Sequence, residues 1–589
     1  MIPISFSDCF GWLHPAEGDC AVLLCGALGY EGRSVHRPWR LLADRLAAAG
    51  FPTMRFDYPG SADACGGDDA AQVETWLQSV RDAAGWLRST TGVQRLALCG
   101  LRFGAALAAL AAAEIPDVAA LALLAPVISG RVHRRELTAV ARMDEASQEP
   151  GWHEAAGLRL PLATLDRIAR IDLREVRTAP APHVLILDPV GTTAVADYAT
   201  RLGSLGVAVR REDFPGYDRF LCDANANEVP ELAYRRVTEW LVGVVPLGRV
   251  ARAPSAALLA SLAVLHPPGA IERPFRFGED RRLFGMLCEP PADREKHGTT
   301  DLAVVICNTG GDPHYGIGRL GVTLARRIAQ RGVASLRMDF SGAGDSEAEA
   351  GARIHLYETD RGPEIAAALD LLQGLGYRRF IVTGICSGGY HALHAAVAES
   401  RIGGLVVVNL ARLHWRVGDS LELAQRRAMR STRFYRDRLK QRDVWRRLLR
   451  AEVNFRGILL TLARRLTRRF AGAALAPVLP IAERLGLALR HARPGRAFAA
   501  LARRGVQVAV VLGQEDPGID ELEQYFGASG RDLRAFPTVR VTIVPGLDHM
   551  LARHAARQRF IALFLEFLRD RYGVAPPSPA VADQGFRVT

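Results

Sequence analysis

The sequence repeats itself at a distance of about half its length. The segment Arg55–Asp63 (Arg-Phe-Asp-Tyr-Pro-Gly-Ser-Ala-Asp) matches Arg337–Asp345 (Arg-Met-Asp-Phe-Ser-Gly-Ala-Gly-Asp) at an offset of 282 residues. A second pair of segments, Gly100–Gly104 and Gly384–Gly388, is offset by 284 residues. A chain of 589 residues also exceeds what one hydrophobic core usually organises. The repeat therefore predicts two domains of the same architecture, one after the other.

The repeat continues toward the end of each half, but with a longer spacing. Leu187–Gly191 matches Glu515–Gly518 at an offset of 328, and Phe214–Phe220 matches Val544–Met550 at an offset of 330. The second half therefore contains about 44 additional residues before its acidic turn. We expect this insertion to form a lid.

Within each half, apolar runs of strand length alternate with helical patterns. Cys20–Gly26 is followed by the helical pattern Pro38–Ala49, and Leu302–Asn308 is followed by Leu320–Gln330. This alternation favours an α/β fold in which a mostly parallel sheet is flanked by helices. The proline-rich stretch after Val245 predicts a linker, and the proline cluster near the C-terminus predicts a disordered tail. The expected domains are 1–245 and 273–574, with a linker at 246–272, a lid at about 412–496 and a tail at 575–589.

The segments Gly100–Gly104 and Gly384–Gly388 differ at their central residue. Each follows an apolar run and precedes an alanine-rich helical pattern, as a sharp strand-to-helix turn does. In a Gly-x-nucleophile-x-Gly turn, the central residue has a strained backbone and its side chain stands exposed above the sheet. Cys386, at the centre of the second turn, can act as a nucleophile. Arg102, in the first, cannot, because its guanidinium group stays protonated.

These motifs resemble those of the α/β-hydrolases. The closer resemblance is to bacterial tandem α/β-hydrolases of the serine-aminopeptidase-like type, including those associated with exosortase and polysaccharide gene clusters. It covers nearly the whole chain and rests on Arg337–Ser346, Gly384–Gly388, Asp516–Gly518 and Gly546–His549. The resemblance implies two tandem α/β-hydrolase domains. It says little about the substrate, because this fold hosts many unrelated reactions.

The second half carries the three residues that nucleophilic acyl chemistry needs, in the chain order nucleophile, acid, histidine that this fold uses. Cys386 is expected to attack a carbonyl carbon after losing its proton to His549. Asp516 is expected to hold the imidazole in the productive tautomer. The adjacent helix N-terminus favours the thiolate over the thiol.

The oxyanion hole is expected to consist of the backbone N–H groups of Ser387 and Thr309. Thr309 precedes the pair Gly310-Gly311, which would let the main chain approach the substrate. Ser387 is also the rival nucleophile. With Ser387 at the tip of the turn, the flanking positions would be Ile385 and Gly389, and a branched residue fits that position badly.

Two further choices depend on geometry. Asp520 lies one helical turn beyond Asp516 and is the alternative acid. His314, in the loop beyond Gly311, is either a substrate-binding residue or an ordinary loop residue.

The first half has the same motifs but lacks the nucleophile and the histidine. Arg102 replaces the nucleophile, Arg219 stands where the histidine would be, and Asp188 remains. We expect no hydrolytic activity from residues 1–245. Either Arg102 pairs with Asp188 in a structural pseudoenzyme domain, or the two arginines bind a carboxylate or phosphate by bidentate contacts.

Positive charge is concentrated in the expected lid. From Arg412 to Arg496 there are 22 Lys and Arg against 6 Asp and Glu, an excess of 16, whereas the whole chain has a formal net charge of +12. Arginines alternate with apolar residues at helical spacing, which predicts amphipathic helices. The lid is either a solvated basic face or a site for an acidic carrier protein, an anionic glycan or an anionic membrane surface. The sequence shows no nucleic-acid-binding motif, so no nucleic-acid partner is expected.

The remaining composition is that of a globular protein, with 49% hydrophobic and 23% charged residues. The N-terminus has no basic n-region, and no apolar run reaches about 18 residues, so we expect a cytoplasmic protein without a transmembrane segment. Nine cysteines lie scattered, without a CxxC pair. Neither a disulfide framework nor a metal site is expected, and no cofactor.

A cysteine nucleophile forms a thioester intermediate, which amines, hydroxyls and thiols attack more readily than an ester. Hydrolysis and acyl transfer therefore both fit the motifs. We predict a hydrolase of acyl esters or thioesters with a Cys-His-Asp triad. The alternatives are an acyltransferase in a biosynthetic pathway for a polysaccharide or secondary metabolite, and a non-catalytic binding or scaffolding protein.

Overall fold

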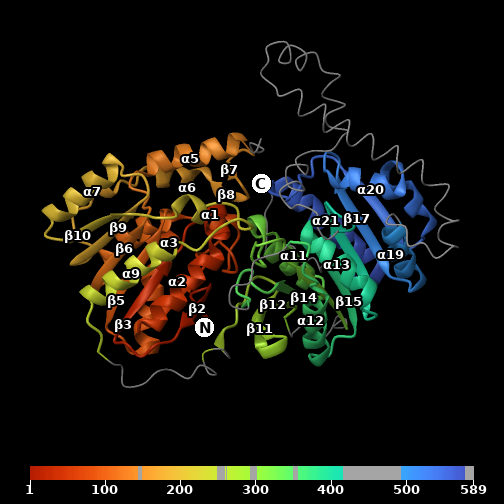
Figure 1. Cartoon of the computed structure of the whole chain (residues 1–589), viewed down its shortest axis with the longest axis horizontal. Coiled ribbons are helices and arrows are strands. Elements are labelled where there is room, and N and C mark those ends of the chain that lie inside the picture. The colour runs from red at the N-terminus through yellow and green to blue at the C-terminus, as the bar shows by residue number, and fades with distance from the viewer. Residues whose placement is uncertain are drawn as a thin grey trace, which may run out of the picture.

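Two eight-stranded sheets form the framework of the chain, one in each half (Figure 1). The structure, a computed structural model, describes residues 1–143, 149–248, 259, 262–291, 301–348, 356–415 and 492–576. In each sheet the second strand runs antiparallel to both neighbours and the strands beyond it are parallel. The first sheet has the order β1 (Ile2–Phe6), β2 (Cys9–His14), β4 (Thr53–Phe56), β3 (Cys20–Cys25), β5 (Arg95–Leu101), β6 (Val118–Leu124), β9 (His183–Asp188) and β10 (Ala208–Asp213). The second has the order β11 (Ile271–Phe277), β12 (Leu283–Glu289), β14 (Ala334–Asp339), β13 (Leu302–Cys307), β15 (Arg379–Ile385), β16 (Ile402–Val408), β17 (Gln507–Gly513) and β18 (Val539–Val544).

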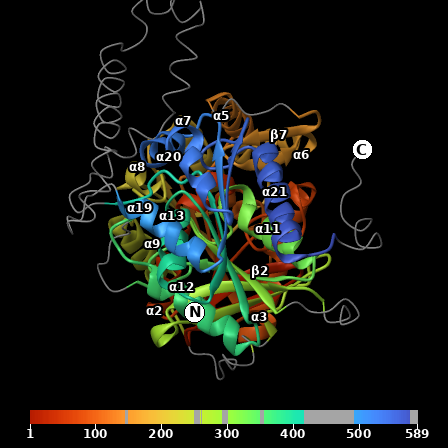
Figure 2. The same ribbon diagram turned by 90° about the vertical axis from the view of Figure 1, so that its right-hand side faces the viewer.

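Helices cover both faces of each sheet. Figure 2 shows helices α12, α13 and α19 on one side of the second sheet and α11 and α21 on the other. The first domain has α1 (Gly29–Ser34), α2 (His36–Ala48), α3 (Val73–Thr91), α4 (Phe103–Ala112), α5 (Gly130–Met143), α6 (Leu162–Ala169), α7 (Thr193–Ser204), α8 (Tyr217–Phe220), α9 (Glu231–Val244) and a hairpin of β7 (Trp152–Ala155) and β8 (Leu158–Pro161). The second has α11 (Leu320–Ala329), α12 (Gly362–Gly374), α13 (Ser387–Ala398), α19 (Ala492–Arg503), α20 (Gly518–Phe526) and α21 (His554–Tyr572). The 3₁₀ helices are η1 (Asp68–Ala70), η2 (Leu173–Glu175), η3 (Glu279–Arg281), η5 (Ile317–Arg319) and η6 (Ala528–Ala535).

The central strands explain why the sequence folds into sheets covered on both faces. β3 (Cys-Ala-Val-Leu-Leu-Cys) and β13 (Leu-Ala-Val-Val-Ile-Cys) are buried at every position. A strand inside a parallel sheet has helices on both sides, so it is apolar throughout and does not alternate with polar residues. Each sheet accordingly has one apolar cluster on each face, four in all among the described residues.

A fifth apolar cluster joins the two domains. It consists of residues on β2 and β12 with Cys65 and Leu265, and the rings of Trp12 and Phe284 meet edge to face at 4.9 Å. The second strands of the two sheets therefore meet in a buried, apolar contact.

Buried ion pairs surround that contact. Arg337 of the second domain binds Asp63 of the first at 2.9 Å, and Arg55 of the first binds Asp345 of the second. All four side chains are buried. The same two positions of the repeated segment thus provide an arginine and an aspartate from each domain.

The expected fold class is confirmed: two tandem α/β domains with mostly parallel sheets. The last helix of the first domain ends at Val244, and the second sheet begins at Ile271. Most of the expected lid (residues 416–491) lies outside the described residues, as do much of the linker and the tail from residue 577. Among the helices that the structure describes, none has the length and apolar character needed to cross a membrane.

Candidate active site

Cys386 lies at the tip of a strained turn between β15 and α13. Its φ of 50° and ψ of −114° lie in a region that residues with a Cβ rarely adopt. A Cβ on Gly384 would lie 2.4 Å from the carbonyl carbon of Gly388, and one on Gly388 would lie 2.5 Å from the carbonyl oxygen of Asn308. The turn therefore needs both glycines, and Cys386, not Ser387, occupies its tip.

His549 and Asp516 lie together at the carboxyl end of the second sheet. The Nδ1 atom of His549 is 2.6 Å from Oδ2 of Asp516, whose side chain is completely buried. Asp516 also accepts a hydrogen bond of 2.7 Å from the N–H of Gly518. The side chain of Asn409 donates to the backbone carbonyl of His549 at 2.8 Å and thereby fixes the loop. The geometry thus pairs His549 with Asp516, the residue preferred over Asp520 from the sequence.

His549 also interacts with the thiol of Cys386, and the two groups shift each other's pKa. Burial by itself raises the pKa of Cys386, but the charge and hydrogen bond of His549 outweigh it, so this pKa lies below its ordinary value. Burial by itself lowers the pKa of His549, but the thiolate of Cys386 and the hydrogen bond to Asp516 raise it well above its ordinary value. The pair therefore favours a thiolate beside an imidazolium, the reactive form of a nucleophilic cysteine.

The other eight cysteines differ from Cys386 in this respect. All nine are free thiols. Burial is the main cause that raises the pKa of each of the other eight. Cys25, Cys99 and Cys307 lie in strands and are buried, as the sequence suggested. Cys386 is therefore the one cysteine whose surroundings favour the thiolate.

Tyr357 is a neighbour of the thiol that the sequence did not reveal. Its hydroxyl lies 3.5 Å from Sγ of Cys386 and helps to lower the pKa of that thiol. The ring stacks on Trp415 with centroids 4.9 Å apart. Tyr357 stands in an irregular segment before α12 with no motif around it, so no sequence signal marks it.

The loop after β13 lies directly beside the turn that carries Cys386. The hydroxyl of Thr309 donates to the carbonyl of Ile385 at 3.0 Å, and the N–H of Gly310 donates to Oγ of Ser387 at 2.9 Å. Ser387 is buried and its hydroxyl is engaged in this contact. Its backbone N–H is in the first turn of α13, where no intrahelical acceptor is available. The expected oxyanion donors, the N–H groups of Thr309 and Ser387, are thus on two segments in contact.

The corresponding turn of the first domain has the same backbone and a different environment. Arg102 has φ 54° and ψ −120°, close to the values of Cys386. Its guanidinium binds Glu31 at 2.8 Å and Glu136 at 2.9 Å. The expected pairing of Arg102 with Asp188 is wrong, because Arg102 is paired with carboxylates from α1 and α5.

Asp188 and Arg219 also have partners of their own. Asp188 binds Arg211 at 2.9 Å and accepts hydrogen bonds from the N–H groups of Val190 and Thr192. Arg219 binds Glu228 at 2.6 Å, and both of these side chains are exposed. Both Arg102 and Arg219 are therefore already paired with carboxylates.

His314 lies between the domains. Its Nε2 is 2.6 Å from Asp63 and its Nδ1 is 2.9 Å from Asp339. With Asp339 and Asp345 it also forms a group whose potential metal-binding atoms lie within 4.8 Å of one another. Both ring nitrogens are already hydrogen-bonded and Asp345 is paired with Arg55, so this group joins the domains by ion pairs.

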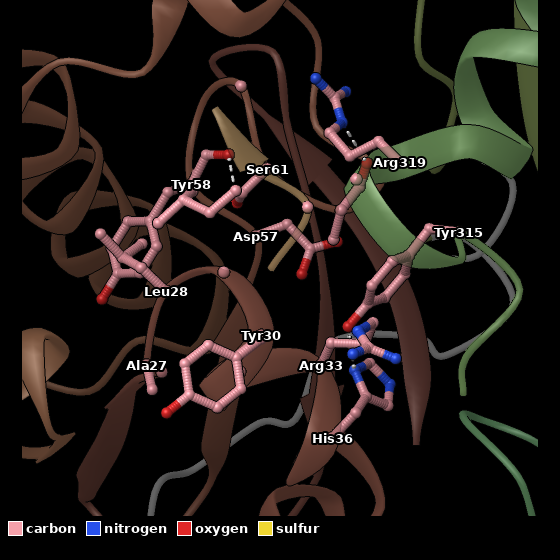
Figure 3. A pocket seen from close by; sticks show the side chains of 18 of the residues that line it. Ala27, Leu28, Tyr30, Arg33, His36, Asp57, Tyr58, Ser61, Tyr315 and Arg319 are labelled. Atoms are coloured by element: carbon pink, nitrogen blue, oxygen red, sulfur yellow. Dashed lines mark hydrogen bonds between the residues drawn. The ribbon is translucent and has the colours of Figure 1, made fainter. Parts of the chain in front are cut away.

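A cavity of about 130 Å³ also lies between the domains, and Cys386 is not part of its lining (Figure 3). Tyr30, Asp57 and Ser61 of the first domain and Tyr315 and Arg319 of the second line it. Burial and the nearby carboxylate of Asp63 raise the pKa of Asp57 to about 7. The cavity therefore contains a carboxyl group that changes charge near neutral pH.

Comparison with known proteins gives matches in both halves of the chain. A family model described as "Alpha/beta hydrolase family" matches residues 297–563, and one described as "Serine aminopeptidase, S33" matches residues 32–149. No curated protein sequence matches the chain.

Solved structures that match part of the chain include Est1E from Butyrivibrio proteoclasticus with ferulic acid bound. It has 16% identity and a TM-score of 0.33, covering 41% of this chain and 99% of that one. The mouse alpha/beta hydrolase domain-containing protein 10 has 15% identity and a TM-score of 0.30, covering 41% of this chain and 98% of that one. XC6422 from Xanthomonas campestris, described as an a/b serine hydrolase without lid, has 16% identity and a TM-score of 0.28, covering 41% and 92%.

Proposed function

Since this chain is an α/β-hydrolase with two such domains in tandem, we propose that its second domain hydrolyses an acyl ester or thioester through Cys386, His549 and Asp516. The observation that carries the proposal is the thiol on a strained turn, facing an imidazole whose other nitrogen lies 2.6 Å from a buried carboxylate. A nucleophile, a base and a group that orients the base are the parts that acyl transfer requires.

The proposed reaction has two steps. In the first, the thiolate of Cys386 attacks the carbonyl carbon, and the carbon–oxygen or carbon–sulfur bond to the leaving group breaks. The imidazolium of His549 gives its proton to the leaving group, so an acyl-enzyme thioester and a neutral alcohol or thiol result. In the second step, neutral His549 takes a proton from water, the resulting hydroxide attacks the thioester, and the thiolate of Cys386 leaves. The carboxylate of Asp516 keeps the imidazole oriented and stabilises its charged form.

The negative charge that develops on the carbonyl oxygen needs hydrogen-bond donors. The N–H groups of Thr309 and Ser387 are proposed for this role, because one begins the glycine-containing loop and the other begins α13. A helix N-terminus adds a favourable dipole for an anion.

Hydrolysis of p-nitrophenyl butyrate by the wild type and by Cys386→Ala tests the proposal. We expect the variant to lose at least about a thousandfold in kcat, since removal of a nucleophile abolishes the covalent route. Arg102→Ala is the matched control, because it changes the equivalent residue of the first domain and should keep nearly full activity. Equal rates above the uncatalysed background for the wild type and Cys386→Ala would exclude Cys386 as the nucleophile, whereas a wild-type rate no higher than the background would favour the binding or scaffolding alternative.

Acyl transfer is the second proposed outcome of the same chemistry. The specific feature that favours it is the sulfur of Cys386, because a thioester reacts readily with amines and thiols. An acidic carrier protein or an anionic glycan would deliver or accept the acyl group at the basic segment 412–496, and the reaction would take place in the cytoplasm. Product analysis with and without an added amine acceptor separates the two outcomes by showing whether the acyl group reaches water or the amine.

A further inference from the structure

The first domain contacts the loop that carries the proposed oxyanion donor of the second. The N–H of Gly311 donates a hydrogen bond of 2.8 Å to Oδ1 of Asn225. Asn225 belongs to the segment after α8, and α8 contains Arg219, the counterpart of His549. In a catalytic domain, the equivalent segment would follow the catalytic histidine. Here it contacts the candidate active site of the second domain.

The side chain of Asn225 is held in the orientation that this contact needs. Its Nδ2 donates to Oδ1 of Asp223 at 2.7 Å, and its backbone N–H donates to the same atom at 2.9 Å. Because the amide nitrogen is bound to Asp223, the amide oxygen faces Gly311. The acceptor is therefore preorganised within the first domain.

The packing at this contact is close enough to require glycine on the other side. A Cβ on Gly310 would lie 2.2 Å from Oδ1 of Asn225, and one on Gly311 would lie 2.5 Å from the carbonyl oxygen of Ala224. The sequence suggested that these glycines let the main chain approach the substrate. The first domain also lies directly beside them, so their small size serves the contact between the domains.

The loop is held from both sides. Toward the turn of Cys386, it is fixed by the hydroxyl of Thr309 and by the N–H of Gly310. Toward the first domain, Asp312 forms an ion pair with Arg33, in addition to the bond between Gly311 and Asn225. The peptide group that presents the N–H of Thr309 directly precedes these anchors in the chain.

We propose that Asn225 of the first domain is a positioning residue for the oxyanion loop of the second. This inference rests on the proposed function of Cys386. By accepting the Gly311 N–H, Asn225 fixes the loop so that its donor points to the oxygen of the tetrahedral intermediate. The domain that lacks a nucleophile therefore completes the site of the domain that has one.

The test compares acylation with simple alkylation in the full-length chain. The acylation rate constant with p-nitrophenyl butyrate depends on the oxyanion hole, whereas alkylation of Cys386 by iodoacetamide needs only the thiolate. For Asn225→Ala we expect acylation to slow by about 10- to 100-fold, because donors that are displaced by a fraction of an ångström stabilise the intermediate poorly. The alkylation rate, its pH profile and the melting temperature should stay at the wild-type values.

Two further variants sharpen the result. The double variant Asp223→Asn with Asn225→Asp reverses the donor and acceptor between the two side chains, keeps an acceptor for Gly311, and should recover much of the lost acylation rate. Asn227→Ala removes an amide of the same segment that donates to Ser34 within the first domain, and should acylate at nearly the wild-type rate.

The outcomes are distinguishable. Normal acylation by Asn225→Ala overturns the inference and leaves the proposed function intact. Equal losses of acylation and alkylation, or the same loss in Asn227→Ala, show general loosening of the structure and also overturn it. A wild-type protein that forms no acyl-enzyme overturns the proposed function and this inference with it.

Discussion

Arg337 of the second domain binds Asp63 of the first, with Nη2 and Oδ1 2.9 Å apart and both side chains buried. The pair Arg55–Asp345 joins the same two repeat positions in the opposite direction. Each domain thus contributes one arginine and one aspartate to these two ion pairs, as identical subunits do at a twofold interface. The two halves of this chain pack like a dimer whose subunits have been joined into one polypeptide.

Removing one of these arginines should destabilise the contact between the domains. Arg337 also binds Glu272 at 2.6 Å, so Arg337→Met leaves two buried carboxylates without this partner. We expect a loss of about 3–5 kcal/mol in the free energy of unfolding, measured by urea denaturation. Glu239→Gln, which breaks the exposed pair of Arg235 and Glu239, is the matched control and should cost less than about 1 kcal/mol. Similar effects for the two variants would contradict a role of Arg337 in joining the domains.

The lowered pKa of Cys386 predicts the pH dependence of its alkylation. The thiolate reacts and the thiol does not, so the rate should fall as the pH decreases through this lowered pKa and reach a plateau above it. In His549→Gln the stabilising positive charge is gone, and the half-maximal rate should move to higher pH. Measurement of the iodoacetamide rate from pH 5 to 10, with the modified peptide identified by mass, checks this. A wild-type midpoint at or above that of an ordinary cysteine would contradict the proposed ion pair.

Tyr357 should contribute a smaller part of the same effect. Its hydroxyl helps to lower the pKa of Cys386, and Tyr357→Phe removes the hydroxyl while keeping the ring that stacks on Trp415. Loss of this hydrogen bond should move the alkylation midpoint to higher pH, by less than His549→Gln does, because the charge of His549 is the larger cause of the lowered pKa. An unchanged midpoint in Tyr357→Phe would show that the hydroxyl does not stabilise the thiolate.

Asp57, in the cavity between the domains, makes stability depend on pH. Its pKa is raised from 3.8 to about 7 in the folded protein by burial and by Asp63 and Asp345, against the opposing charge of His36. The folded state therefore holds a proton that the unfolded state has lost, and stability should fall as the pH rises from about 4 to 7. Asp57→Asn avoids this loss and should be more stable than the wild type above pH 7 by roughly 4 kcal/mol, the equivalent of about three pKa units.

Thermal unfolding at pH 4.5 and pH 8 checks this prediction. The gap between Asp57→Asn and the wild type should widen with pH. The exposed Asp69→Asn is the control and should show the same difference from the wild type at both pH values. A constant gap for Asp57→Asn would mean that Asp57 is ionised throughout this range.

The repeated segments were sufficient to predict the architecture. Buried strands such as β13 are continuous apolar runs, and the turn at Cys386 needs glycines that the sequence displays. The order of nucleophile, acid and histidine likewise follows the order of strands in the sheet, so His549 and Asp516 could be named before their contact was known. The apolar strands and the glycines of the turn are local features, so a short stretch of sequence is enough to predict them.

Contacts between the domains could not be predicted in this way. Nothing near Asn225 indicates that it accepts a hydrogen bond from Gly311, because the partner lies 86 residues away in the other domain. The same applies to Arg102, whose partners Glu31 and Glu136 come from helices that a linear motif does not place beside it. The sequence thus predicted the candidate site residues of each domain, but it did not predict which distant residues would contact them.

The most direct test of the proposed mechanism is to locate the acyl group on the protein. Full-length protein is mixed with p-nitrophenyl butyrate, quenched in acid within the first turnover, and examined by intact mass and by peptide mapping. We expect one butyryl group in the wild type, located on Cys386 by fragmentation of the peptide that contains both Cys386 and Ser387, and none in Cys386→Ala. A butyryl group on Ser387 or elsewhere, or no covalent adduct while hydrolysis proceeds, would contradict it.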